Sequence, residues 1–131
     1  NVESPQLRQT IETLRQAGKK IVLLDDVPYF EFHAMECEFV RLVGPRPRCD
    51  TSRSHYQELK NGHVPQLEMI ARETDAELLS VGEVFCSLDT CSMVKGDVLQ
   101  YADNGHVNVQ GSRTLIKEIL LTQSASDSKI D

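Results

Sequence analysis

Residues 20–25, KIVLLD, are the stretch that decides the fold. The run is short, continuous and apolar, it contains β-branched residues, and it lies between Gly18 and Pro28. Such a run is typical of a strand that is buried on both faces, as in a parallel sheet. A second run, ELLSV at residues 77–81, predicts a second strand.

Helical patterns precede, separate and follow these two runs. Apolar residues recur at helical spacing over residues 7–14, which predicts a first helix. A second helix is expected over residues 54–73, with Pro65 as a break or a fresh start, and a third over residues 108–122. The order helix, strand, helix, strand, helix predicts an α/β layered fold with a parallel sheet.

The expected domain organisation is one domain over residues 1–122 and a polar, disordered tail over residues 123–131. Because two strands are too few for a stable doubly wound sheet, we expect the missing strands to precede Asn1. Residues 26–54 contain prolines, two cysteines and the aromatic stretch YFEFH, and they predict a long loop that is functional or stapled. The aromatic side chains of this stretch either stack on sugar rings or pack onto the core.

The composition excludes several classes of function. With 14 Lys and Arg against 20 Asp and Glu, the formal net charge is -6, and no basic run marks a nucleic-acid or membrane-surface footprint. No apolar run approaches the roughly 18 residues that a membrane span needs. We expect no cofactor and no metal, because Cys-x4-Cys without a second close pair is a poor zinc pattern.

Four cysteines bear on the compartment of the protein. Cys37, Cys49, Cys86 and Cys91 allow three pairings. The local pairing, Cys37 with Cys49 and Cys86 with Cys91, closes two short loops, and disulfides would place the domain in an oxidising compartment. Four reduced thiols in a cytosolic protein are the alternative.

The segment YADNGHVNVQGSRTL at residues 101–115 carries the candidate chemistry. Asp103 and His106 lie three residues apart in a loop that opens onto a helix. The carboxylate of Asp103 can therefore accept the Nδ1 proton of His106 and leave Nε2 as a general base. An imidazole pKa near about 6.5 suits proton transfer close to neutral pH. The competing interpretation is a hydrogen-bonded surface pair without a catalytic role.

The partner that such a pair normally serves is a serine hydroxyl, and no serine of this sequence has the right setting. Ser80, Ser87, Ser92 and Ser112 are present, yet none stands in a Gly-Asp-Ser or G-x-S-x-G motif. The sequence therefore supplies the pair without its nucleophile.

Three stretches resemble one known family, the SGNH domains that are fused to membrane-bound acyltransferase family 3 proteins. They are IVLLDDVPYF at residues 21–30, FCSLDTC at residues 85–91 and DNGHVNVQGSRTL at residues 103–115. The last is similar to the family's final block, which usually reads D-x-x-H-L-S-x-x-G-S. Val107 and Asn108 stand where Leu and Ser are usual, and Asn and Ser are equivalent helix caps. The family's Ser, Gly and Asn blocks are absent from this sequence.

The resemblance implies a three-layer α/β/α SGNH-hydrolase (flavodoxin-like) fold. This chain would hold its C-terminal half, with about two core parallel strands and three helices. The resemblance also implies that His106 is the general base and that Asp103 orients it. The nucleophile serine would lie upstream, so this chain alone is expected to be inactive.

The implied function is serine-dependent O-acyl transfer, typically O-acetylation of a bacterial surface polysaccharide. Its partners would be an acyl donor, a polysaccharide acceptor and a membrane-embedded acyltransferase domain upstream in the same chain. The domain is expected to be periplasmic, as the extracytoplasmic part of an inner-membrane protein. Two alternatives remain open: a secreted SGNH esterase or deacetylase, and a non-catalytic periplasmic glycan-binding module.

Overall fold

The computed structural model describes residues 5–43 and 49–127. In chain order its elements are α1 (Pro5–Gln16), β1 (Val22–Leu24), α2 (Ala34–Val43), β2 (Asp50–Ser52), α3 (Arg53–Thr74), β3 (Glu77–Leu79), the short 3-10 helix η1 (Gly82–Phe85), β4 (Thr90–Ser92), β5 (Val94–Lys95), β6 (Val98–Leu99) and α4 (Val109–Asp127). The two predicted strands correspond to β1 and β3, and the three predicted helices to α1, α3 and α4.

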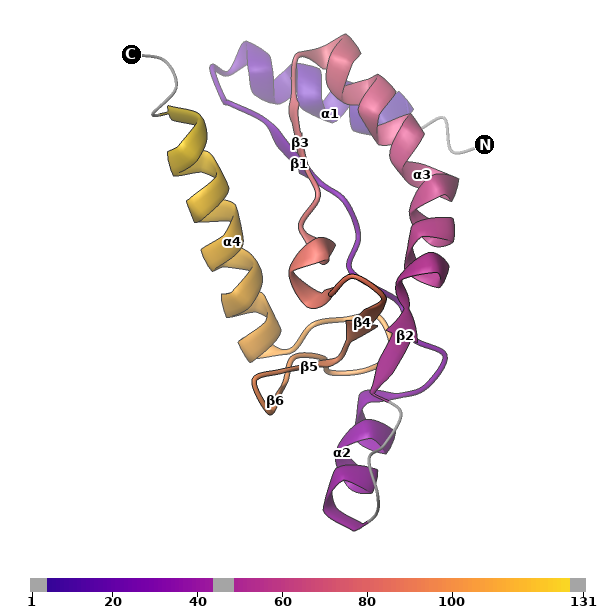
Figure 1. The fold of residues 1–131 in the computed structure, drawn as a ribbon. Helices are drawn as coiled ribbons and strands as arrows, with labels where there is room; N and C mark the ends of the chain where they lie inside the picture. The colour runs from indigo at the N-terminus through magenta and orange to yellow at the C-terminus, as the bar shows by residue number, and fades with distance from the viewer. Residues whose placement is uncertain (1–4, 44–48, 128–131) are drawn as a thin grey trace.

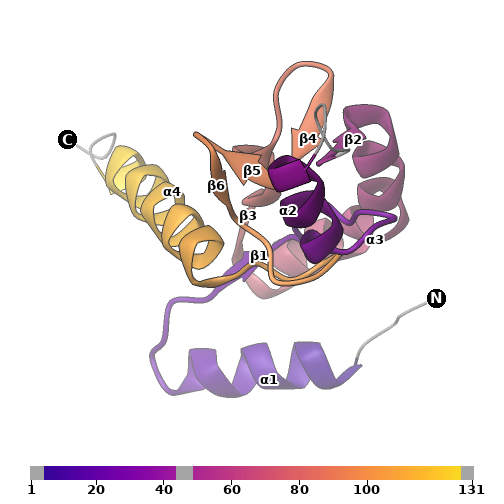
Figure 2. The ribbon, with the colours of Figure 1, turned by 90° about the horizontal axis from the view of Figure 1, so that it is seen from below.

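β1 and β3 form a parallel pair, as the two apolar runs predict. Their register extends from Val22 opposite Glu77 to Leu24 opposite Leu79. α3 is the crossover that connects the two strands, and the pair runs between α3 on one side and α4 on the other in both ribbon views (Figures 1 and 2). The predicted fold class is therefore confirmed, because helices flank a parallel strand pair.

α1 lies beside the C-terminal half of α3 (Figure 1). Ile11 is the buried residue of its apolar face. Arg8 forms an ion pair with Glu73, and Arg15 lies 3.6 Å from Asp75. Because partly exposed pairs of this kind add little to stability, burial of the apolar face is the main contribution that keeps α1 in place.

The segment predicted as a long loop, residues 26–54, contains a helix and a strand, so that prediction is wrong. α2 begins after His33, whose backbone N–H donates to Glu36 Oε1 at 3.2 Å and so caps the first turn. Ala34 and Cys37 are buried on one face of α2. The disulfide between Cys37 and Cys49 joins this face to the residue before β2. The predicted disulfide between these two cysteines is therefore present. The helical pattern of α2 was not recognised in the sequence because prolines and cysteines interrupt the segment.

α3 runs without interruption through Pro65, so the predicted break there is wrong. The helix begins after Ser52, whose hydroxyl accepts a hydrogen bond from the backbone N–H of His55 at 3.1 Å. Tyr56 and Ile70, on either side of Pro65, are both buried. Packing of both halves against the rest of the domain outweighs the hydrogen bond that Pro65 removes.

The hydrophobic core cluster draws its buried side chains from the segment after β1, from α2, from η1 and from the chain around the short strands β2 and β4 to β6. Phe30, Phe85, Met93 and Tyr101 are buried there. The ring of Tyr101 meets those of Phe30 and Phe85 at centroid distances of 5.0 Å and 5.4 Å. β2 with β4, and β5 with β6, form antiparallel pairs around this cluster. The cluster therefore supports the loop that follows Tyr101.

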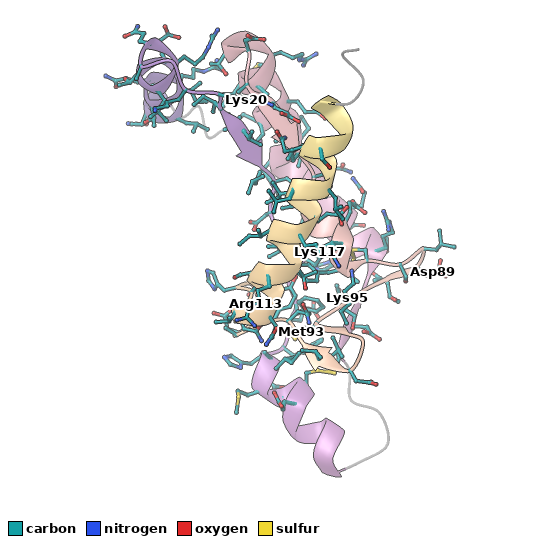
Figure 3. All side chains as sticks on the ribbon, turned by 90° about the vertical axis from the view of Figure 1, so that its left-hand side faces the viewer. Lys20, Asp89, Met93, Lys95, Arg113 and Lys117 are labelled. Carbon is teal, nitrogen blue, oxygen red and sulfur yellow. A yellow bond between two sulfur atoms is a disulfide. The ribbon has the colours of Figure 1, made fainter. Side chains whose placement is uncertain are left out.

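α4 ends at Asp127, beyond the expected end at residue 122, and residues 128–131 of the predicted tail lie outside the described residues. Gln123 accepts a hydrogen bond from Lys20 Nζ at 3.1 Å, which joins this part of α4 to the residues before β1. Figure 3 shows α4 from its outer side, with Arg113 and Lys117 along it. Among the described residues, no helix is both long enough and apolar enough to cross a membrane.

Candidate active site

The loop of residues 101–108 leads from β6 into α4 and carries the predicted pair. It is closed at its base by a bridge between Tyr101 and Val107 and by a hydrogen bond from the Ala102 N–H to the His106 carbonyl at 2.8 Å. Tyr101 is buried in the aromatic cluster. A loop closed in this way holds its tip residues in a fixed relationship to the core.

Asp103 and His106 meet as the spacing predicts. His106 Nδ1 lies 2.8 Å from Asp103 Oδ2. The other carboxylate oxygen, Oδ1, accepts the backbone N–H groups of Gly105 and His106 at 2.8 Å and 2.7 Å. Because Asp103 is held by two backbone donors, its second oxygen points in a fixed direction and orients the imidazole.

The same hydrogen bonds set the ionisation of Asp103. The N–H of Gly105, followed by the side chain and N–H of His106, lowers the pKa of Asp103 from 3.8 to about 2. A carboxylate therefore faces His106 at every physiological pH. The His106 side chain is 84% exposed, so its second ring nitrogen is accessible to a reaction partner.

A second segment, directly after β1, anchors this loop. The N–H of Phe30 donates to the carbonyl of Asn104 at 2.8 Å, and Asn104 Nδ2 donates to the Tyr29 hydroxyl at 2.5 Å. A Cβ added at Gly105 would lie 3.0 Å from the Tyr29 ring, so the absence of a side chain there allows the close approach. The sequence singled out the aromatic stretch but gave no signal for this contact.

The base of α4 fixes the other end of the loop. Asn108 Oδ1 accepts the N–H groups of Gln110 and Gly111 at 2.9 Å and 3.0 Å, which confirms the predicted cap. Asn108 Nδ2 donates to the Tyr101 carbonyl at 3.2 Å. Gly111 packs so tightly that a Cβ there would overlap the Gln100 carbonyl. The cap and this glycine hold the first turn of α4 against the loop.

A buried ion pair, which sequence reasoning missed, joins the end of β1 to α3. Lys60 Nζ lies 2.9 Å from Asp25 Oδ2, and the two side chains are 9% and 1% exposed. Lys60 also contacts Glu83 Oε1 at 3.2 Å. Burial alone lowers the pKa of Lys60, but hydrogen bonds and charge from Asp25 and Glu83 outweigh it and raise the pKa overall. The sequence signal that could have indicated this ion pair is Asp25, a charged residue directly after the apolar run of β1.

Three of the four serines considered from the sequence have other hydrogen-bond partners. Ser80 donates to Asp25 Oδ2 at 2.6 Å, Ser87 donates to the Thr90 carbonyl at 3.1 Å, and Ser92 Oγ accepts the Val94 N–H at 3.2 Å. The fourth, Ser112, lies in the first turn of α4. Within the described ranges, no serine hydroxyl hydrogen-bonds to His106.

The cysteines pair locally, Cys37 with Cys49 and Cys86 with Cys91, so the predicted disulfides are present. In the part of the chain that the structure describes, no group of three His, Cys, Asp or Glu side chains is arranged to hold a metal ion.

Two comparisons with known proteins match this chain. The family model described as "SGNH domain (fused to AT3 domains)" matches residues 1–120. The fold is similar to that of the periplasmic domain of a lipopolysaccharide acetyltransferase from Salmonella ser. Paratyphi A, with a TM-score of 0.61 and 18% sequence identity. The similarity covers 88% of this chain and 47% of that one, so the chain spans about half the length of the solved domain. No curated protein matches the chain.

Proposed function

Because this chain belongs to the family of SGNH domains fused to AT3 domains, we propose that it contributes the Asp–His pair of a serine-dependent O-acyltransferase. The observation that carries the proposal is the 2.8 Å contact between His106 Nδ1 and Asp103 Oδ2. In this role His106 Nδ1–H donates a hydrogen bond to the Asp103 carboxylate, and Nε2 is the general base. The nucleophile serine would come from a segment of the same domain that precedes this chain.

The proposed reaction has two halves. In the first, the serine oxygen attacks the carbonyl of the acyl donor while its proton passes to His106 Nε2. The leaving group of the donor takes that proton as the acyl–serine ester forms. In the second, a sugar hydroxyl gives its proton to Nε2 and attacks the ester. The serine oxygen recovers the proton, and the O-acyl sugar departs.

Asp103 assists both halves without giving up its own charge. Its carboxylate stabilises the imidazolium that forms each time Nε2 takes a proton. The two backbone N–H groups on Oδ1 favour the ionised form of Asp103, so the imidazolium proton stays on His106. We expect His106→Ala to abolish acyl transfer and Asp103→Asn to weaken it.

The proposed setting is extracytoplasmic. Two disulfides are typical of oxidising compartments such as the bacterial periplasm. The family description implies a membrane acyltransferase domain in the same protein, which would deliver the acyl group. The acceptor would be a surface polysaccharide, which is consistent with the lipopolysaccharide acetyltransferase that the fold resembles.

A serine-reactive fluorophosphonate tests this proposal on the intact protein purified from its host. The unaltered protein is expected to be labelled on one serine, and His106→Ala is expected to lose the labelling. His33→Ala is the matched control, because His33 is also an exposed histidine and lies outside the loop of residues 101–108. Absence of labelling in the unaltered protein, or full labelling of His106→Ala, would contradict the proposal and favour a glycan-binding module.

A further inference from the structure

The side chain of Tyr29, in the segment after β1, meets the tip of the candidate catalytic loop. Its hydroxyl oxygen accepts a hydrogen bond from Asn104 Nδ2 at 2.5 Å. A Cβ added at Gly105 would lie 3.0 Å from the Tyr29 ring, so the ring lies against the Gly105 backbone. Asn104 and Gly105 are the two residues between Asp103 and His106. Tyr29 therefore contacts the loop at the point that separates the two members of the pair.

The core holds the backbone on both sides of Tyr29. Pro28 and Phe30 are fully buried, whereas Tyr29 itself is 47% exposed. The Phe30 N–H also donates to the Asn104 carbonyl at 2.8 Å, so this segment holds Asn104 through its backbone as well as through a side chain. Because its neighbours are fixed, the Tyr29 ring is a firm support for the loop. Its exposure also means that burial of this ring contributes less to stability than burial of Phe30.

The backbone of Gly105 connects this support to the candidate pair. Its N–H donates to Asp103 Oδ1 at 2.8 Å, and Asp103 Oδ2 lies 2.8 Å from His106 Nδ1. The same N–H is the largest cause of the low pKa of Asp103. A displacement of Asn104 and Gly105 would therefore weaken the hold on Asp103 and, through it, the orientation of the imidazole.

We propose that Tyr29 is a positioning residue for the general base. It holds Asn104 and Gly105 in place, so that the Gly105 N–H stays on Asp103 and Asp103 keeps the His106 ring in one orientation. In this role Tyr29 takes up no proton and contacts neither the acyl donor nor the acceptor. The inference rests on the proposed function for the role of His106.

The test measures the rate constant of fluorophosphonate labelling of the intact protein at saturating probe. Tyr29→Phe keeps the ring and loses the hydroxyl that accepts from Asn104. Its rate constant is expected to fall about three- to tenfold, which corresponds to the net contribution of one hydrogen bond, while the final extent of labelling stays complete. A role in stability alone would lower the final extent and leave the rate constant unchanged, and that result would overturn the inference.

Tyr56→Phe is the matched control. The Tyr56 hydroxyl donates to the Asp26 carbonyl at 3.1 Å, so this variant also loses a hydrogen bond to the segment after β1, but not one to the loop. Its labelling rate constant is expected to equal that of the unaltered protein. Equal decreases in Tyr56→Phe and Tyr29→Phe would overturn the inference, because a general loosening of the segment would then explain both.

A double variant tests the route through Asn104. Asn104→Ala removes the amide donor and keeps the backbone carbonyl to which Phe30 donates. If the Tyr29 hydroxyl acts through Asn104, adding Tyr29→Phe to Asn104→Ala is expected to cause no further decrease in the labelling rate constant. Decreases that multiply in the double variant would show that the hydroxyl acts elsewhere and would overturn the inference.

Hydrogen exchange of the Gly105 amide in the intact protein separates this inference from the proposed function, because exchange does not depend on the serine. The Gly105 N–H is expected to exchange faster in Tyr29→Phe than in Tyr56→Phe, since its hydrogen bond to Asp103 is held less firmly. If the unaltered protein is not labelled, the proposed function fails, and the exchange comparison still decides whether Tyr29 holds the loop. Equal exchange rates in the two variants would overturn the inference.

Discussion

The backbone N–H of Phe30 donates to the carbonyl of Asn104 at 2.8 Å, which fixes the loop of the candidate pair to the segment that follows β1. Phe30 itself is fully buried against the Tyr101 ring. The loop is therefore held from below by the aromatic cluster and from the side by this hydrogen bond. The exposed His106 ring thus stands on a rigid support, as a preorganised base requires.

The first prediction concerns the pH dependence of Asp103. Its folded pKa of about 2 lies below its ordinary 3.8, so its contribution to stability is present above about pH 3.8 and is lost as the pH falls through about 2. Carbon-13 NMR of the side-chain carboxyl would measure the midpoint. In His106→Ala the midpoint is expected to rise but to stay below 3.8, because the Gly105 N–H is the largest cause of the shift. A midpoint at 3.8 would show that Gly105 does not hold the carboxylate.

The second prediction concerns two glycines with opposite environments. Gly111→Ala is expected to lower the free energy of unfolding by about 1–3 kcal/mol, because a Cβ there overlaps the Gln100 carbonyl. Gly62→Ala is the control: Gly62 lies inside α3, a Cβ there meets nothing within 4 Å, and stability should rise by roughly 0.5–1 kcal/mol. Urea unfolding measures both changes, and equal changes of either sign would contradict the packing at Gly111.

The third prediction concerns the buried ion pair. Lys60→Met leaves Asp25 buried without its cation and is expected to lower stability by about 3 kcal/mol. Lys20→Met removes the exposed pair with Glu77 and is expected to cost less than about 1 kcal/mol. Since pairing raises the pKa of Lys60, its contribution is complete below pH 10.5 and is lost as the pH rises beyond the folded pKa. Similar losses in the two variants, measured by urea unfolding, would show that burial does not distinguish them.

The fourth prediction concerns the disulfides. In protein from its native compartment, all four cysteines should be disulfide-bonded and should not react with an alkylating agent. After reduction all four should be alkylated, as mass spectrometry would show. Replacing both Cys37 and Cys49 with Ala is expected to destabilise the chain more than replacing both Cys86 and Cys91, by about 0.8 kcal/mol, since the first loop is longer. Four free thiols before reduction would contradict the extracytoplasmic setting.

Local patterns in the sequence predicted the two strands and the hydrogen bond of the candidate pair. The apolar runs at residues 20–25 and 77–81 predicted the parallel pair, and the spacing of Asp103 and His106 predicted their hydrogen bond. Both depend on residues that are neighbours in the chain or on simple periodicity.

Contacts between distant residues gave no such signal. Tyr29 and Asn104 are 75 residues apart, and the Ser80 contact with Asp25 spans 55 residues. Neither follows from periodicity, because tertiary packing brings these side chains together. The helix over residues 54–73 was predicted, but its continuity through Pro65 was missed for the same reason, since the buried residues on both sides outweigh the local cost of proline.

The central claim, that His106 is the general base of an O-acyltransferase, is tested most directly by the acetyl content of the host's surface polysaccharide. Proton NMR would compare strains that carry the unaltered gene, His106→Ala and His33→Ala. The account predicts that His106→Ala removes the O-acetyl signal, while His33→Ala retains it. An O-acetyl signal of unaltered intensity in the His106→Ala strain would contradict the claim.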